Sequence, residues 1–545
     1  MSFFQLVRRE MQGSLPRLVA MSGLGGISNA AILAAVNTGA QAAGTGKVSL
    51  PSAALFLTAL FLFIKTQHYV LITTTVEIEA IIHRLRVRLM DQVRRAELLP
   101  LETIGRAEIT SAITKETATL TQATNSLAFA AQGVVLILFV AIYVAYLSFL
   151  AFVLSVGIVG LAAALFLAKS QQLNMATRKA LEWDNRLFDR LADLLDGFKE
   201  VKLNRARSND LFHDVTEVSR NAANIKISSQ SETFKRLVFS QSSMYVLLGA
   251  IVFVVPIFSS TVGQSLMKTT TALLFVIGAC WGLVQSIPML TAANAAANNI
   301  EQLEARLLAS VATVQKSGAE PRRFDKIEMH NVVFRYTDKS SDSVFQVGPL
   351  DFSLRSGELV FIAGGNGSGK STFLKLLAGL YPPDSGEIAL DGVRVNDGRL
   401  AEYRELISAI FSDYHLFQRL YGIPDPDPAE VDRLVAQFGL SDKTRLTDGE
   451  FRTLDLSTGQ RKRLALIVSL LETRSIMLLD EWTADQDPEF RRKFYRELLP
   501  ALHRAGKTVV VVTHDDRYIN DPELPGRKLR MDEGRFVKQH SVENG

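Results

Sequence analysis

The stretch from Phe361 to Thr372, FIAGGNGSGKST, has the residue types and spacing of a phosphate-binding loop. Gly364 and Gly369 are the spaced glycines of the pattern G-x-x-x-x-G-K-[ST], and Lys370 and Ser371 complete it. Glycines let such a loop curl, so that its backbone N–H groups and the N-terminus of the next helix point at phosphate oxygens. Lys370 would reach the β- and γ-phosphates, and the Ser371 hydroxyl would hold Mg²⁺. The stretch therefore predicts a nucleotide site.

The segments on either side of the loop support this interpretation. An apolar run at 359–362 enters the loop and a helical pattern at 372–377 leaves it, which is the strand, loop and helix context that the motif requires. Glycine-rich turns beside a lysine also arise by chance, but the complete pattern in this context favours the nucleotide site. The other residues expected at the nucleotide are Asn366, Gly367, Ser368 and Thr372.

The two halves of the 545-residue chain differ in composition. Residues up to about 300 contain long uncharged runs, whereas the remainder alternates short apolar runs with charged segments, as a soluble α/β domain does. The hydrophobic fraction of 48% indicates a membrane protein. The formal net charge of +4 is too small to favour nucleic acid as a partner. The single cysteine, Cys280, excludes an intrachain disulfide, and the N-terminal residues do not resemble a removable signal peptide.

Six segments are apolar over about twenty residues, the length that crosses a bilayer. The segment from Thr117 to Ala168 has no charged side chain and is far too long for one span, so two helices with a turn near Ser148 are expected. Any single segment could instead be a buried core helix, but six in one half of the chain favour membrane spans. We predict transmembrane helices at about 18–43, 51–75, 124–147, 149–169, 237–260 and 269–292.

Basic residues predict the orientation in the membrane. The segments between spans two and three and between spans four and five are rich in arginine and lysine, whereas the opposite side offers only Lys47 and Lys268 in short loops. By the positive-inside rule, both basic segments and both termini are cytoplasmic. Leucine and isoleucine recur at helical spacing in these segments, so the membrane helices are expected to continue into the cytoplasm. Their turns, near 98–101 and 204–209, would contact a cytoplasmic domain.

Two ionisable residues, Lys65 and His68, fall within the second predicted span. An ionisable side chain at membrane depth is costly unless it faces a cavity or a partner. The two side chains could extend toward the inner headgroups. Alternatively, they line a translocation cavity and attract an anionic part of a cargo.

The order of motifs after residue 320 resembles the nucleotide-binding domain of ATP-binding-cassette (ABC) transporters. With six spans before it, the whole chain is similar to an exporter-type half-transporter of that superfamily. The resemblance implies an all-α six-helix transmembrane domain followed by an α/β P-loop ABC nucleotide-binding domain. The expected boundaries are 1–315 for the transmembrane domain, 316–324 for the linker and 325–545 for the ATPase domain.

The resemblance implies further nucleotide contacts. Tyr336 matches the aromatic residue that stacks on adenine, with a core tyrosine as the less favoured alternative. The run LSTGQ matches the family signature LSGGQ with a threonine in place of one glycine, and Asp487 matches the aspartate of the D-loop. The residues of the signature expected near a γ-phosphate are Ser457, Thr458, Gly459 and Gln460.

The same resemblance implies the catalytic and metal-binding residues. The apolar run 476–479 followed by Asp480 and Glu481 matches the Walker B pattern. Asp480 would hold Mg²⁺ through water, and Glu481 would orient or deprotonate the attacking water. His514, after the run 509–513, matches the switch histidine that senses the γ-phosphate. Ser412 stands where the family has the Q-loop glutamine, and it is a further candidate metal ligand with a shorter reach.

Three further stretches resemble exporters of cyclic or knotted peptides and peptide siderophore precursors, of the pyoverdine, syringomycin and microcin type. They are EWTADQDP at 481–488, THDD at 513–516 and SDYHLF at 412–417. The resemblance implies ATP-driven export of a small peptide-like cargo across the inner (plasma) membrane of a bacterium, with envelope efflux proteins as candidate partners. A lipid or glycolipid flippase would share every ATPase motif, and an ATP-gated channel or sensor is a third possibility. Import is less favoured because nothing resembles a docking surface for an extracellular binding protein.

The motif count predicts a homodimer. The chain has one phosphate loop and one signature, and in this family each ATP lies between the phosphate loop of one domain and the signature of another. Two copies related by a two-fold axis would complete two sites.

Overall fold

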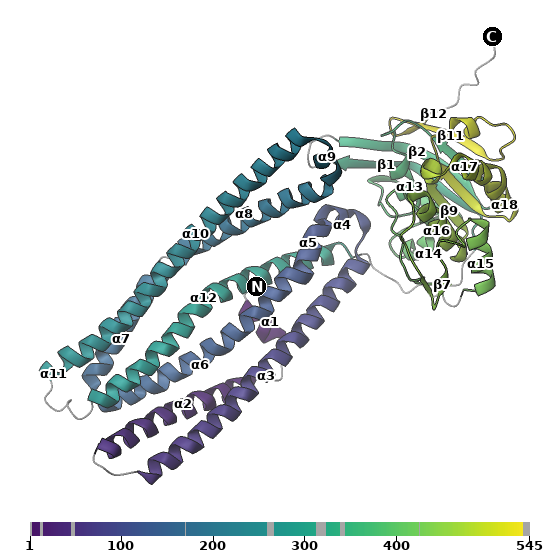
Figure 1. Cartoon of the computed structure of the whole chain (residues 1–545). Coiled ribbons are helices and arrows are strands. Elements are labelled where there is room, and N and C mark those ends of the chain that lie inside the picture. Colours follow the sequence, from purple (N-terminus) through teal and green to yellow (C-terminus); the bar gives the residue numbers. More distant parts are fainter. Residues whose placement is uncertain are drawn as a thin grey trace. The chain divides into compact units, whose positions relative to one another are not determined.

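The computed structural model describes residues 3–10, 15–44, 49–168, 170–258, 266–311, 323–337, 344–423 and 426–537. The chain divides into two compact units, which are described separately below (Figure 1). The first comprises Met1–Asp91 and Arg106–Arg306, and the second comprises Gln92–Gly105 and Leu307–Gly545. Most of the linker expected at 316–324 lies outside the described residues.

The first unit is built from long helices (Figure 1). In lipid every backbone polar group must be satisfied within the protein, and a helix satisfies them within one segment. The long helices are α2 (Leu15–Gly44), α3 (Leu50–Arg95), α6 (Thr117–Leu147), α7 (Phe149–Ala168), α8 (Ser170–Asp196), α10 (Arg205–Gly249) and α12 (Leu266–Ala309). The shorter elements are α1 (Phe3–Glu10), α5 (Arg106–Ser111), η1 (Ala112–Glu116), α9 (Phe198–Leu203), η2 (Ala250–Val254) and α11 (Val255–Phe258).

Within the described residues, five helical segments are long and apolar enough to cross a membrane. They are Pro16–Gly44, Leu50–Arg95, Arg106–Leu147, Arg205–Ile257 and Leu266–Ala309, and a shorter apolar helix covers Phe149–Ala164. The fourth predicted span corresponds to α7, which has 20 residues and begins directly after Ser148, the extended residue that ends α6. Helix α3 has 46 residues, or about 69 Å at 1.5 Å each, and so exceeds the thickness of a bilayer.

The second unit contains a central, mostly parallel sheet (Figure 1). Its strand order is β12 (Arg535–Val537), β11 (Arg527–Asp532), β3 (Leu359–Ala363), β10 (Thr508–Val512), β9 (Ile476–Asp480) and β6 (Ile407–Ile410), with only β12 antiparallel. An antiparallel sheet has the order β2 (Val344–Arg355), β1 (Lys326–Thr337), β4 (Ser385–Leu390) and β5 (Val393–Arg394). Strands β7 (Leu446–Thr447) and β8 (Glu450–Phe451) form a hairpin.

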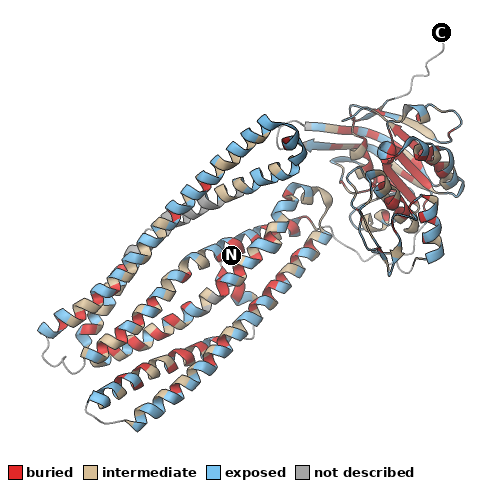
Figure 2. Ribbon diagram, in the orientation of Figure 1, coloured by how far each residue is buried: buried red, intermediate tan, exposed pale blue. Residues whose placement is uncertain are grey.

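Two apolar cores cover the faces of the central sheet. Val360 and Ile362 of β3 belong to one core, whereas Leu359 and Phe361 belong to the other, as the alternation of side chains along a strand requires. Figure 2 shows this sheet as the most continuous buried region of the second unit. The helices around the sheets are α13 (Lys370–Leu377), α14 (Leu400–Arg404), α15 (Pro428–Gln437), α16 (Thr458–Leu471), η4 (Trp482–Asp485), α17 (Pro488–Lys493), η5 (Phe494–Leu498), α18 (Leu499–Arg504) and α19 (Asp516–Ile519).

A short helix from the N-terminal half, α4 (Leu98–Ile104), belongs to the second unit. Leu98 and Leu99 pack against one of its apolar cores. The Arg404 guanidinium donates to the carboxylate of Glu97, and the carboxylate of Glu102 accepts from Tyr381 at 2.6 Å and from Lys375 at 3.2 Å. The expectation that the turn near 98–101 contacts the nucleotide domain is confirmed.

Candidate functional site

The predicted phosphate loop connects β3 to α13, as its strand and helix context requires. Gly369 precedes the helix with φ of 97°, a left-handed conformation that a side chain disfavours. A Cβ at Gly364 would lie 2.2 Å from the carbonyl oxygen of Met531, so only glycine fits that close approach. Asn366 and Gly367 are exposed at the tip, whereas Ser368 is buried. The backbone is shaped to present its N–H groups to an anion.

Lys370 is buried at the start of α13 and bonds to its own loop. Its ammonium donates to the carbonyl oxygens of Gly364 at 3.0 Å and Gly365 at 2.7 Å. Burial lowers the pKa of Lys370, and the nearby carboxylates of Glu481 and Asp480 act in the opposite direction. The lysine therefore lies where the loop and the end of β9 meet.

Asp480 ends β9 and is 1% exposed. Neither carboxylate oxygen has a hydrogen-bond partner of normal geometry among the described residues. Burial raises the pKa of Asp480, the charge of Glu481 raises it further, and the nearby Ser371 hydroxyl, Ser412 backbone and Lys370 lower it. A buried carboxylate with free oxygens beside a hydroxyl suits Mg²⁺, which needs few protein ligands when phosphates supply others. The side chain of Ser412 is exposed beside this position, at the end of β6.

Glu481 and His514 meet at the carboxyl ends of adjacent strands. Strands β9 and β10 pair in parallel, with Asp480 opposite Val512. Nε2 of His514 lies 2.8 Å from Oε1 of Glu481, so the two predicted catalytic residues are in contact. Glu481 has φ of 48°, a left-handed conformation that costs a non-glycine residue about 1–3 kcal/mol and is typical of functional sites. The pair has the groups required to hold a water and accept its proton.

A lysine that sequence reasoning did not single out supports the backbone at Glu481. Lys462 of α16 is buried, and its ammonium donates to the Glu481 carbonyl at 2.9 Å and to the Asp485 carboxylate at 2.7 Å. Nε1 of Trp482 donates in return to the Lys462 carbonyl at 2.8 Å. No local signal identifies Lys462, since a lysine two residues after a signature ordinarily indicates a solvated helix face.

The predicted signature forms the N-terminus of α16. Ser457 caps the helix, its hydroxyl accepts from the Gln460 backbone, and the Gln460 side chain accepts from the Ser457 backbone. A Cβ at Gly459 would lie 2.5 Å from the Asp485 carbonyl oxygen, so this glycine permits close packing against η4. Thr458 replaces the other family glycine without such a clash, as the first residue of the helix. Among the described residues, no hydrogen bond or ion pair joins residues 457–460 to the phosphate loop.

The two remaining predicted nucleotide contacts, Tyr336 and Asp487, belong to other elements. Tyr336, near the end of β1, is 48% exposed and pairs across the sheet with Phe345, so its ring is free to stack on a base. Asp487 caps α17 by accepting from the Phe490 backbone, and it also pairs with Arg463 of α16. The Phe490 bond, followed by Arg463, lowers the pKa of Asp487. Asp487 thus joins the signature helix to the D-loop within one chain.

Comparison with known proteins agrees with this geometry. The family model described as ABC transporter matches residues 347–484. The chain is 33% identical over 478 residues to ATP-binding protein SyrD of Pseudomonas syringae pv. syringae, covering 84% of this chain and 82% of SyrD. It is also 32% identical over 201 residues to the glutamate/aspartate import ATP-binding protein GltL of Escherichia coli, covering 34% of this chain and 80% of GltL.

Among solved structures, a bacterial Atm1-family ABC exporter with ATP bound has a similar fold. The TM-score is 0.75 at 20% sequence identity, and the match covers 98% of this chain and 95% of the exporter. The expected fold class is confirmed. The apolar helices and the ATPase domain are those of a membrane-embedded transporter with a cytoplasmic domain that couples ATP hydrolysis to transport. The chain belongs to the ABC transporter family and has the architecture of an exporter.

Proposed function

We propose that this ABC exporter moves a small peptide, cyclic peptide or peptide siderophore precursor out of the cytoplasm. The observation that carries the proposal is a cavity of about 540 Å³ inside the helical unit. Four carboxamide side chains from four membrane-spanning helices line it: Asn29 of α2, Gln67 of α3, Gln132 of α6 and Gln285 of α12. The rest of the lining is glycine, serine and apolar residues, including Phe63 and Phe129.

The four carboxamides have no hydrogen-bond partner among the described residues. Polar groups at membrane depth are costly, and those that face a cavity mark a path for substrate. A carboxamide offers two donors and an acceptor, and a peptide group offers one donor and one acceptor. This lining therefore suits an uncharged backbone rich in amide groups, with phenylalanine rings beside it for apolar side chains.

Lys65 and His68 do not line this cavity. Both side chains are exposed, and Lys65 lies over the Phe61 ring at 5.7 Å from its centroid. Phe63 and Gln67 face the cavity from the same helix, and Lys65 is about 180° around the helix from them at 100° per residue. The cavity thus gives no support to the hypothesis that Lys65 and His68 attract an anionic cargo.

The ATPase site drives the proposed export. ATP is expected to bind with its phosphates on the loop around Gly369 and Lys370 and its adenine on Tyr336. Glu481 accepts a proton from the attacking water, and His514 contacts the γ-phosphate. Ser371 and Asp480 would hold Mg²⁺, which when bound neutralises charge on the phosphates.

The proposed working unit is a homodimer. Residues 457–460 have no hydrogen bond or ion pair to the phosphate loop among the described residues of one chain, which fits a signature that completes the partner's site. ATP then favours the state in which the two ATPase domains close on one another, and hydrolysis removes that preference. The transport cycle is alternating access biased by ATP.

The export proposal is tested by untargeted mass spectrometry of medium and cell extract from the producing cells. Wild type is compared with Glu481→Gln at equal expression, because this substitution removes the proposed base and retains the side-chain size. A peptide that disappears from the medium and accumulates in the cells is the expected result. An altered lipid distribution without any peptide difference would contradict the proposal and favour a lipid or glycolipid flippase.

The contacts of α4 lead to a prediction about coupling. Glu97 and Glu102 hold α4 on the ATPase domain through Arg404, Lys375 and Tyr381. Replacing both glutamates by alanine is expected to lower export at least roughly fivefold, with smaller loss of ATP hydrolysis, since allosteric coupling is worth 1–3 kcal/mol. Export is measured as the mass-spectrometric signal in the medium, and hydrolysis on the purified protein.

The matched control for this prediction is Glu108→Ala. Glu108 pairs with Arg306 at 2.6 Å, but both side chains are nearly half exposed, and such pairs contribute little. The control should export as wild type does. Equal loss of export and hydrolysis in the double variant would show that α4 supports the ATPase fold rather than coupling.

A further inference from the structure

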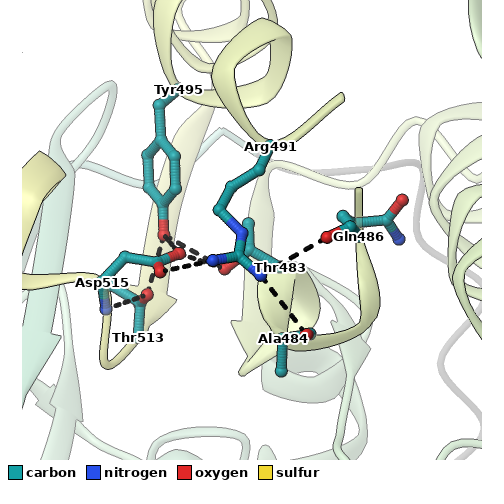
Figure 3. Close-up of polar contacts among 7 residues, drawn as sticks. All are labelled: Thr483, Ala484, Gln486, Arg491, Tyr495, Thr513 and Asp515. Carbon is teal, nitrogen blue, oxygen red and sulfur yellow. Dashed lines mark hydrogen bonds and ion pairs between the residues drawn. The ribbon is translucent and has the colours of Figure 1, made fainter. Parts of the chain in front are cut away.

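Behind the contact between Glu481 and His514 lies a cluster of five polar residues: Thr483, Arg491, Tyr495, Thr513 and Asp515, called here the Asp515 cluster. Figure 3 shows their side chains converging on the Asp515 carboxylate. Thr483, Tyr495 and Thr513 are at most 3% exposed. None of the five has a part in the ATP site described above.

The carboxylate of Asp515 accepts hydrogen bonds from three elements. The Thr483 hydroxyl donates to Oδ2 at 2.9 Å, the Tyr495 hydroxyl donates to Oδ2 at 3.0 Å, and the Arg491 guanidinium donates to Oδ1 at 3.2 Å (Figure 3). Thr483 lies in η4, Tyr495 in η5 and Arg491 in α17. The partly buried Asp515 carboxylate therefore holds η4 and the continuous helical segment formed by α17 and η5.

The Thr513 and Tyr495 hydroxyls form a cyclic chain of hydrogen bonds with Asp515. The Asp515 backbone N–H donates to the Thr513 hydroxyl at 3.1 Å, and that hydroxyl lies 2.7 Å from the Tyr495 hydroxyl. Because Tyr495 donates to Asp515, Thr513 donates to Tyr495, so the hydroxyls of Thr483, Tyr495 and Thr513 all donate, whereas Nε of Arg491 has no partner among the described residues. Burial raises the pKa of Tyr495, so its hydroxyl remains protonated and keeps donating.

The position of the cluster relates it to catalysis. Thr483 is two residues after Glu481, and Thr513 and Asp515 flank His514. Glu481 directly follows β9, and His514 follows β10. The last backbone hydrogen bond between these two parts of the chain runs from the Glu481 N–H to the Val512 carbonyl at 3.0 Å. Just after this bond, the cluster connects the same two parts of the chain a second time. Glu481 requires such support because its left-handed backbone conformation is unfavourable for a residue other than glycine.

Arg491 also connects the cluster to the D-loop. The Arg491 guanidinium also approaches the carbonyl oxygens of Ala484 and Gln486, each at 3.4 Å (Figure 3). Tyr495 lies in the π-helical turn η5, and such turns are rare and frequent at functional sites. Its ring stacks on Tyr518 with centroids 4.2 Å apart, which fixes the direction of the hydroxyl.

We propose that Asp515, Tyr495 and Thr483 are positioning residues that hold the carboxylate of Glu481 and the imidazole of His514 in the geometry for ATP hydrolysis. They act through the two segments that carry the catalytic pair. The proposal rests on the proposed roles of Glu481 and His514. Substitution of a positioning residue should lower kcat without a matching rise in KM for ATP.

The test uses the purified full-length transporter and its steady-state ATP hydrolysis. Tyr495→Phe and Asp515→Asn should lower kcat at least roughly tenfold and change KM for ATP less than about threefold, because a misplacement near 1 Å costs up to a hundredfold in rate. Thr483→Val should resemble them, and Thr483→Ser, which restores the hydroxyl, should recover most of the rate. Thermal unfolding confirms that each variant is folded.

Tyr403→Phe is the matched control. Tyr403 is also fully buried, and its single hydroxyl bond goes to the Leu377 carbonyl, away from the catalytic pair. It should lower the unfolding temperature while kcat stays at the wild-type value. If folded Tyr495→Phe and Asp515→Asn both kept the wild-type kcat, or raised KM as much as they lowered kcat, the positioning role would be wrong.

A double-mutant cycle separates this proposal from the proposed roles of the catalytic pair. If His514→Ala lowers kcat, adding Tyr495→Phe should lower it by a smaller factor than Tyr495→Phe does in the wild type, since the positioning of His514 is already lost and effects within one unit are not additive. A fully additive loss would overturn the positioning role and leave the role of His514 intact. A His514→Ala variant with the wild-type kcat would overturn the proposed site itself.

Discussion

Glu481→Gln is expected to stop ATP hydrolysis and to leave ATP bound. Glutamine keeps the shape of the side chain and can still hydrogen-bond to His514, but it cannot accept a proton from water. General-base catalysis contributes about 10²–10⁴-fold, so kcat of the purified transporter should fall at least roughly a hundredfold. Equilibrium binding of ATP should change less than about threefold, because Glu481 is expected to contact the water and not the phosphate loop.

Glu489→Gln provides the matched control for this substitution. Glu489 is an exposed acid of α17, eight positions further along the chain, and surface substitutions of this kind have small effects. Its kcat should equal that of wild type. A Glu481→Gln protein that still hydrolyses ATP at a tenth of the wild-type rate or more would remove Glu481 from the role of base. If the Glu481→Gln protein conducted solutes while ATP is bound, that result would instead favour an ATP-gated channel as the function.

Lys370→Ala is expected to lower hydrolysis by the opposite route, through weaker ATP binding. Lys370 is 5% exposed, and its ammonium is held in the phosphate loop by Gly364 and Gly365. A hydrogen bond to a charged group contributes about 1.5–3 kcal/mol, so the loss of one such contact weakens ATP binding roughly 10- to 100-fold. Titration with a fluorescent ATP analogue, together with steady-state hydrolysis, measures both effects.

The control for Lys370→Ala is Lys443→Ala, which removes an exposed lysine of the same domain and should bind ATP as wild type does. Thermal unfolding is also needed, since the alanine variant loses two bonds to loop carbonyls. A folded Lys370→Ala protein with the wild-type affinity for ATP would contradict the phosphate-loop assignment. The two substitutions together distinguish binding from chemistry, because Glu481→Gln retains ATP and Lys370→Ala does not.

The fold class could be predicted because its signals are local. A membrane span is a run of apolar residues, and a phosphate loop is a contiguous pattern between a strand and a helix. The sequence led to six spans. Among the described residues, five helical segments are long and apolar enough to cross a membrane, and α7 adds a helix of 20 residues directly after Ser148.

The contacts around the site were harder to predict. Lys462, 19 residues before Glu481, donates to the Glu481 carbonyl and belongs to no recognised motif. Trp482 lies in a recognised stretch, but nothing in that stretch indicates its hydrogen bond to Lys462. The cavity was also hard to predict, since its four carboxamides come from α2, α3, α6 and α12. The sequence analysis selected Lys65 instead, which lies on a different side of α3. A single glutamine in an apolar run gives no indication of which helix face meets a neighbour.

The sequence by itself determined the chemistry of this protein: a phosphate loop, two acids at the end of a strand, a histidine after the next strand and enough apolar length to cross a membrane. The tertiary structure decided which of these groups meet. Glu481 contacts His514 because β9 and β10 are neighbours in the sheet with Asp480 opposite Val512, and Glu102 reaches Lys375 across 273 positions because α4 packs on the ATPase core. Local patterns constrain the backbone and the burial of each segment, whereas the partners of a side chain depend on strand order, register and helix packing, which many distant residues determine together.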